Sequence, residues 1–104
     1  MPNTPDVVDR HDEQRFVVEL DGHTAELTYR LDGDRLTLIH TGVPDELEGQ
    51  GIGSALVRGA VDRAAEDELT LVPRCAFARR WLTEHPDVAS TVPIDWPPDQ
   101  KGGR

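Results

Sequence analysis

The sequence of 104 residues contains a single cysteine, Cys75. One cysteine cannot form a disulfide within the chain, and it excludes metal sites built from paired cysteines or from cysteine pairs with histidines. The four histidines supply no such site, because His11, His23, His40 and His85 show no ligand spacing. We therefore expect no bound metal.

Long apolar runs are also missing. No stretch approaches the roughly 20 apolar residues that a membrane-spanning helix needs. The first residues, Met-Pro-Asn-Thr-Pro-Asp, lack the basic start and the apolar stretch of a signal peptide. The sequence thus predicts a soluble, cytoplasmic protein without a membrane partner.

Positive charge is scarce, with 11 lysines and arginines against 20 acidic residues and a formal net charge of −9. This balance argues against nucleic acid as a partner, because nucleic-acid binding usually needs a basic surface. The negative field would instead attract cationic groups such as amines over long range. An anionic ligand would have to be held by local geometry.

The length and the hydrophobic content of 37% allow one modest core, and therefore one domain. Proline and polar residues dominate residues 1–14 and 93–104, which we expect to be flexible tails on either side of a domain at 15–92. Trp96 is an exception in the second tail. It could fold that tail back onto the domain or pack against a second copy, so we expect a monomer or a weak homodimer.

Alternating apolar residues predict three strands between residues 16 and 40. Phe16, Val18 and Leu20 mark the first strand, residues 25–31 the second and residues 36–40 the third. Two Asp-Gly pairs, at residues 21–22 and 32–33, separate the strands, and this pair is a strong hairpin signal because glycine accepts positive φ. The sheet should begin as an antiparallel meander.

After Pro44 the apolar period becomes helical from Ile52 to about residue 67. A short strand follows at 69–73, and a last helix around 77–82 is closed by a proline at 86. The expected class is α/β (α+β), with a mixed sheet in which the meander is followed by a βαβ unit and a C-terminal helix. The two strands of that unit should run parallel, and their carboxyl ends share the edge where ligands bind in open α/β sheets.

Gly49, Gly51 and Gly53 alternate just before the predicted helix. This spacing lets backbone N–H groups turn toward a phosphate while the helix N-terminus adds its dipole. An ordinary flexible connector at a helix start is the other interpretation. The dinucleotide-binding G-x-G-x-x-G motif and the P-loop motif are both absent.

Four segments, taken in their order along the sequence, resemble those of a known protein family. They are Leu38-Ile39-His40-Thr41-Gly42-Val43-Pro44, Gly49-Gln50-Gly51-Ile52-Gly53-Ser54-Ala55-Leu56-Val57, Val72-Pro73-Arg74-Cys75-Ala76-Phe77 and Leu82-Thr83-Glu84-His85-Pro86. Over residues 15–90 the chain resembles the small, stand-alone GNAT-like N-acetyltransferases of about a hundred residues, which implies a minimal GNAT fold.

The resemblance also implies acetyl-CoA as cosubstrate. In the family the backbone of the glycine loop holds the pyrophosphate, and the preceding strand holds the pantetheine arm and the acetyl carbonyl. The corresponding cofactor-binding residues here are Thr41, Gly42, Val43, Gly49, Gln50, Gly51, Ile52, Gly53 and Ser54.

The sequence departs from the family pattern at three positions. Glu48 stands where the superfamily usually has Arg or Gln, and Gln50 replaces a frequent basic residue, so acetyl-CoA should bind more weakly than in a typical relative. Phe77 lacks the hydroxyl with which a tyrosine near this position protonates the CoA thiolate in many relatives. From their i, i+4 spacing, Phe77 and Trp81 should pack in the core.

Cys75 and His40 are the candidate catalytic residues. Cys75 precedes a helix whose dipole would stabilise a thiolate, although a small buried thiol is the other interpretation. His40 alternates in phase with Leu36 and Leu38, so we expect it on their face, close to Cys75. It would act as a general base or simply as a hydrogen-bonded residue at the edge of the core.

The resemblance thus implies transfer of an acetyl group from acetyl-CoA to a primary amine, by direct attack or through acetyl-Cys75. Larger relatives insert helices near the position of the Asp21-Gly22 turn, so the acceptor side should be open here. An open site favours an amine on a protein or peptide, or a small amine held loosely. The alternative is a non-catalytic acyl-CoA-binding or protein-interaction module that keeps the fold.

Overall fold

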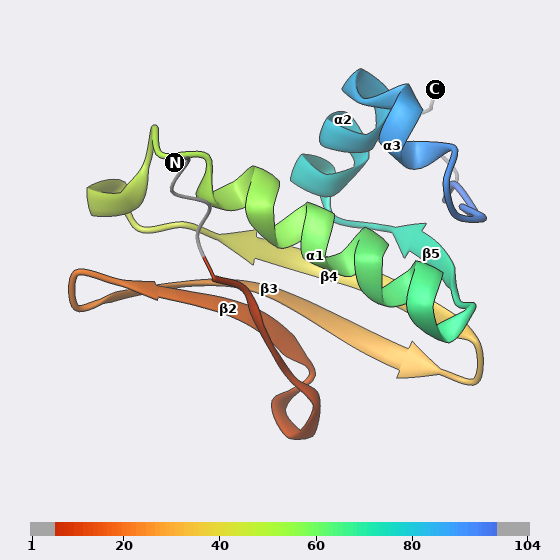
Figure 1. Cartoon of the computed structure of the whole chain (residues 1–104), viewed down its shortest axis with the longest axis horizontal. Helices are drawn as coiled ribbons and strands as arrows, with labels where there is room; N and C mark the ends of the chain where they lie inside the picture. The colour runs from red at the N-terminus through yellow and green to blue at the C-terminus, as the bar shows by residue number, and fades with distance from the viewer. Residues whose placement is uncertain (1–5, 98–104) are drawn as a thin grey trace.

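Five strands form one sheet in the order β1-β2-β3-β4-β5 in the computed structural model, which describes residues 6–97 (Figure 1). The elements are β1 (Val8–Arg10), η1 (His11–Glu13), β2 (Arg15–Leu20), β3 (His23–Asp32), β4 (Arg35–Gly42), η2 (Asp45–Leu47), α1 (Ile52–Asp67), β5 (Thr70–Pro73), α2 (Ala76–Glu84) and α3 (Pro86–Ala89).

Strands β2, β3 and β4 form the predicted antiparallel meander. In the turn between β2 and β3, Asp21 and Gly22 both have positive φ, at 51° and 78°. Two-residue turns with positive φ match the twist of the flanking strands. The Asp-Gly signal therefore located this turn correctly.

Strand β5 pairs with β4 in parallel, and α1 makes the crossover between them. The predicted mixed sheet and βαβ unit are confirmed. Helix α1 packs an apolar stripe onto the sheet, and α2 lies beside it on the same face (Figure 1). One core joins these layers. Its largest fully buried side chains include Phe16, Leu27, Leu36, Leu38, Leu56 and Leu71.

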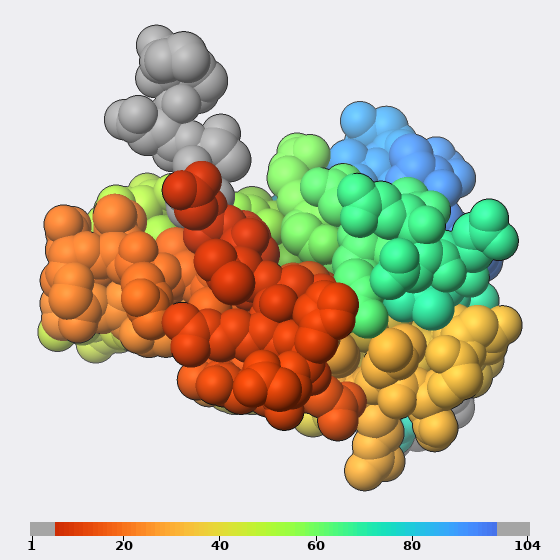
Figure 2. All heavy atoms as spheres, turned by 60° about the horizontal axis from the view of Figure 1, so that its bottom comes forward, coloured from red at the N-terminus to blue at the C-terminus, as the bar shows by residue number. Residues whose placement is uncertain are grey.

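Residues 8–10, which we expected in a flexible tail, form β1 and pair with β2. The hydroxyl of Tyr29 donates a hydrogen bond of 2.6 Å to Asp9, and Val7 packs against the core. In Figure 2 the red residues of this segment lie between the orange β2–β3 hairpin and the green surface of α1. These contacts supply the packing that the composition of the segment did not indicate.

Part of the second predicted tail is also attached to the domain. The backbone N–H of Asp95 donates to Leu71 at 2.8 Å, and Ile94 bridges to the same strand. Trp96 is 46% exposed and lines a shallow hollow beside α2 and α3. The chain therefore folds back here, as one of the two interpretations of Trp96 expected. The remaining tail residues, 1–5 and 98–104, lie outside the described residues.

A β-bulge in β4 changes which face its side chains occupy. Tyr29 pairs with Leu38 and the preceding Thr28 pairs with His40, so Ile39 is an extra residue. Each bulge of this kind shifts the alternation of side chains by one position. Beyond Leu38 the strand therefore presents to the core face the residues that simple alternation would place on the other face.

Candidate functional site

A hollow of about 530 Å³ lies where the end of β4, the glycine loop, the first turn of α1 and the start of α2 meet. Its location agrees with the rule that open α/β sheets bind ligands at the carboxyl ends of their strands. The lining residues are Thr41, Val43, Leu47, Glu48, Gly49, Gly51, Ile52, Gly53, Ser54 and Phe77.

Seven of the nine residues predicted to bind the cofactor line this hollow. The two exceptions are Gly42 and Gln50. Gly42 pairs with Glu26 on β3, and a Cβ atom there would point toward Glu26 and His40. The side chain of Gln50 is exposed, and its amide nitrogen lies 3.5 Å from the carbonyl oxygen of Glu46.

The glycine loop has the backbone conformation of an anion-binding turn. Gly49 and Gly51 have φ values of 83° and 74°, which only glycine adopts without strain. Gly51 is the N-cap of α1 and no side chain caps the helix. The first N–H groups of α1 are therefore free of a side-chain acceptor, beside a hollow where an anion would also meet the helix dipole.

Phe77 belongs to the site, which the sequence reasoning missed. Its ring is 40% exposed and lies against Gly53, where a Cβ atom would come within 2.7 Å of the ring. The i, i+4 spacing with Trp81 suggested two core residues, but only Trp81 is buried. Leu47 was missed as well, because a lone apolar residue in an acidic turn carries no periodic signal.

Cys75 is the N-cap of α2, as predicted, and is only 6% exposed. Its Sγ lies 3.1 Å from Oγ1 of Thr41, close enough for a hydrogen bond to a sulfur. Thr41 lines the hollow, whereas Cys75 is not among the lining residues. The thiol is thus buried beside the Thr41 hydroxyl and does not line the hollow itself.

The expectation that His40 shares a face with Leu36 and Leu38 is wrong. His40 pairs with Thr28, whose neighbours Leu27 and Tyr29 point into the core, and paired residues of antiparallel strands share a face. The extra residue at the bulge moves His40 to the helix-free face and brings Thr41 to the face of Cys75. Cys75 and His40 therefore lie on opposite sides of the sheet.

The two strands of the βαβ unit separate at this point. Their pairing ends at Leu38 and Pro73, and the N–H groups of Arg74 and Cys75 both donate to the carbonyl oxygen of Leu38 at 3.0 Å. Beyond that, residues 40–42 pair with β3 alone among the described strands. An extended ligand could therefore reach the second edge of β4 here.

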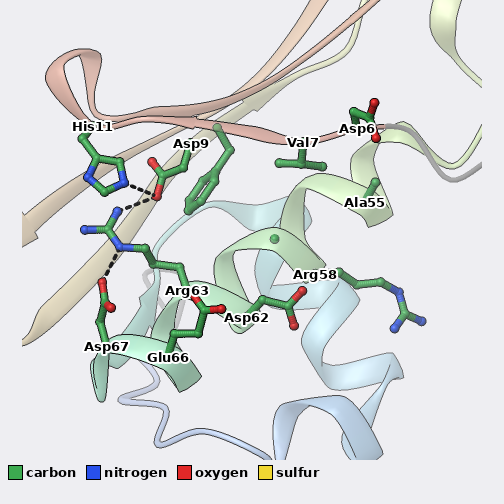
Figure 3. A pocket seen from close by; sticks show the side chains of 12 residues that line it. Asp6, Val7, Asp9, His11, Ala55, Arg58, Asp62, Arg63, Glu66 and Asp67 are labelled. Atoms are coloured by element: carbon green, nitrogen blue, oxygen red, sulfur yellow. Dashed lines mark hydrogen bonds and ion pairs between the residues drawn. The ribbon is translucent and has the colours of Figure 1, made fainter.

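A second hollow, of about 580 Å³, lies between β1 and α1 (Figure 3). Arg63 is bound there to Asp9 at 2.6 Å and to Asp67 at 2.8 Å, and Arg58 points away from this cluster. Five carboxylates in its lining repel an anion. This hollow is consequently a poor match for a phosphorylated ligand, and the glycine-loop hollow is the better candidate site.

Within residues 6–97, no three side chains of His, Cys, Asp or Glu come together in a way that could hold a metal ion. The helices of the described part are also too short or too polar to cross a membrane.

Comparison with known proteins gives a consistent result. The sequence profile of the family described as GCN5-related N-acetyl-transferase matches residues 15–91. Protein NATD1 of Mus musculus is 37% identical over 81 residues, which cover 73% of this chain and 74% of the relative. Protein NATD1 of Homo sapiens is 36% identical, with 73% and 72% covered.

A solved structure shows the same architecture. The NMR solution structure of a GCN5-like protein from Staphylococcus aureus superposes with a TM-score of 0.68 at 28% sequence identity, covering 98% of this chain and 99% of the other.

Proposed function

Because the chain belongs to the GCN5-related N-acetyltransferase family, we propose that it transfers an acetyl group from acetyl-CoA to a primary amine. The observation that carries this proposal is the hollow in which the glycine loop, the first turn of α1 and the end of β4 converge. The acceptor is an amine on a protein or peptide, or a small amine, because a two-residue turn joins β2 and β3 and no helix is inserted there.

The residues of the hollow fit the diphosphate of acetyl-CoA. Gly49 and Gly51 have the positive φ values of a backbone nest, and the space around their Cα atoms is open. The N–H groups at the start of α1 can donate to phosphate oxygens, and the helix dipole favours the negative charge there. The chain can thus hold an anionic ligand despite its net charge of −9.

The end of β4 would position the reacting thioester. The backbone edge of residues 39–42 can bind the amide groups of the pantetheine arm, as a neighbouring strand would. A neutral amine then attacks the acetyl carbon, the carbon–sulfur bond breaks and CoA leaves as its thiolate, and the amine gives up a proton to a base. Positioning of this kind supplies a large part of the rate enhancement in bimolecular transfers.

Direct attack fits the geometry better than the route through acetyl-Cys75. Thr41 lines the hollow, and the buried Cys75 contacts Thr41 from behind. The thiol would therefore be acylated only after Thr41 moved aside. His40 can serve as the general base for an amine that approaches from the helix-free face. It is exposed there, beside Glu26.

Two variants of Gly51 test the proposal with a matched control. Asparagine and aspartate tolerate positive φ better than other side chains, and nothing lies within 4 Å of a Cβ atom at this position. Gly51→Asn and Gly51→Asp therefore differ in charge while sharing size and backbone preference. Isothermal titration should show acetyl-CoA binding about tenfold weaker to the aspartate variant than to the asparagine variant.

Equal affinity of the two variants would place the diphosphate elsewhere and refute the proposed site. Tight binding without acetyl transfer to a panel of peptide amines and polyamines would favour the alternative, a non-catalytic acyl-CoA-binding module. Glu48 and the lack of a hydroxyl on Phe77 are the features of the hollow that favour this alternative.

A further inference from the structure

Helix α2 is attached to the first turn of α1 by two neighbouring contacts. The ring of Phe77 lies on Gly53, and one helical turn later the indole N–H of Trp81 donates a hydrogen bond of 2.8 Å to Oγ of Ser54. Ser54 lines the glycine-loop hollow, whereas Trp81 is 5% exposed and lies behind it. Trp81 thus does not line the hollow, and its N–H bonds to a residue that does.

The bond from Trp81 determines what the Ser54 hydroxyl can do. A serine hydroxyl has one proton and two lone pairs, and an indole N–H can only donate. The oxygen of Ser54 therefore acts as acceptor toward Trp81, and its own proton stays free. Among residues 6–97 that proton has no protein acceptor. Accepting one hydrogen bond also polarises the O–H group and makes it a stronger donor.

The indole is itself held firmly in place. The imidazole of His85 stacks on it with ring centroids 3.9 Å apart and planes 10° from parallel. The guanidinium of Arg58 lies over the ring, with its central carbon 5.1 Å from the centroid. A ring confined in this way keeps its N–H direction, and hence the Ser54 oxygen, in one orientation.

We propose that Trp81 is a positioning residue for the diphosphate of acetyl-CoA: its N–H fixes Ser54 so that the serine hydroxyl donates to a phosphate oxygen. This inference rests on the proposed function. Ser54 would add one side-chain donor to the backbone donors of the glycine loop. Such a donor matters in this chain, because Glu48 contributes a negative charge to the same hollow.

Two acetyl donors provide the test. One is acetyl-CoA, and the other is S-acetylpantetheine, which lacks the nucleotide and its phosphates. Trp81→Phe removes the N–H and keeps an aromatic ring. We expect it to weaken acetyl-CoA binding about fivefold to tenfold, the loss typical of one hydrogen bond. Binding of S-acetylpantetheine should stay within about twofold of the wild type, a selectivity that a purely structural role would not produce.

Ser54→Ala provides a second, independent variant should Trp81→Phe fold poorly. It should show the same selective loss of acetyl-CoA affinity. The double variant should bind acetyl-CoA no more weakly than Ser54→Ala alone, because both substitutions act through one hydroxyl. The control is His85→Phe, which keeps a stacked ring and leaves the indole N–H bond intact. Its acetyl-CoA affinity should match that of the wild type.

The outcomes separate this inference from the proposed function. Equal losses for both donors in Trp81→Phe and in Ser54→Ala, or full additivity of the two substitutions, would overturn the role of Trp81 and leave the function standing. If the wild type binds S-acetylpantetheine as tightly as acetyl-CoA, there is no diphosphate site, and the proposed function fails together with this inference.

Discussion

Tyr29 offers a direct test of the contacts that attach β1 to the domain. Burial, and after it the hydrogen bond to Asp9, raise the pKa of Tyr29 to about 12 from its ordinary value of 10.0. The bond from Arg63 acts in the opposite direction and is weaker in effect. The folded protein therefore disfavours the phenolate.

The pKa also sets the sign and size of a stability change. A pKa of about 12 against 10.0 means that the folded state favours the neutral phenol by about 3 kcal/mol. Because the folded pKa is the higher one, this contribution is fully present below pH 10. It is lost as the pH rises from 10 through about 12, where the unfolded chain ionises first.

The assay is a spectrophotometric titration of phenolate absorbance, because Tyr29 is the only tyrosine in the chain. The native protein should titrate near pH 12, and the protein unfolded in denaturant near pH 10. Circular dichroism verifies that the native sample stays folded. In Asp9→Asn the native midpoint should fall but remain above 10, because burial is the larger cause. A native midpoint equal to that of the unfolded chain would refute the reasoning.

Three further predictions concern the hollow. Glu48→Arg should tighten acetyl-CoA binding about fivefold to tenfold by calorimetry, because a carboxylate near a diphosphate costs on the order of 1 kcal/mol; equal or weaker binding would show that Glu48 points away. If attack is direct, intact-mass measurement after incubation with acetyl-CoA alone should show no adduct, whereas an adduct that disappears in Cys75→Ala would establish the covalent route. Gly53→Ala should displace the exposed ring of Phe77 into the hollow and weaken acetyl-CoA binding about fivefold, with recovery on adding Phe77→Ala; unchanged affinity in Gly53→Ala would contradict this.

Most of the fold followed from local patterns in the sequence. Alternation, two Asp-Gly turns and one change of period predicted the meander, the crossover helix and the parallel strand, and all of them are present. Strand β1 could not be predicted in this way. It pairs with β2, and its Asp9 is bound by side chains distant in the sequence, Tyr29 and Arg63. No local periodicity reports such contacts.

The candidate site was likewise predictable only in part. The glycine loop was predictable because positive φ values and a helix start have strong local signatures at Gly49 and Gly51. The position of His40 was not, because it depends on one unpaired residue at Ile39. A bulge is a property of the pairing between two strands, so it leaves no mark on the alternation of one strand read by itself.

The bulge at Ile39 makes the pairing of β4 with β3 an inherited variable as important as the composition of β4. If a relative kept every residue of β4 but paired it with β3 without the bulge, its histidine and threonine would keep their order in the sequence and exchange faces of the sheet. Two proteins that align without a gap would then have the same residues and opposite chemistry on each side of the strand. For descendants of this fold, loss of the bulge is a way to change which group faces the hollow without substituting His40 or Thr41.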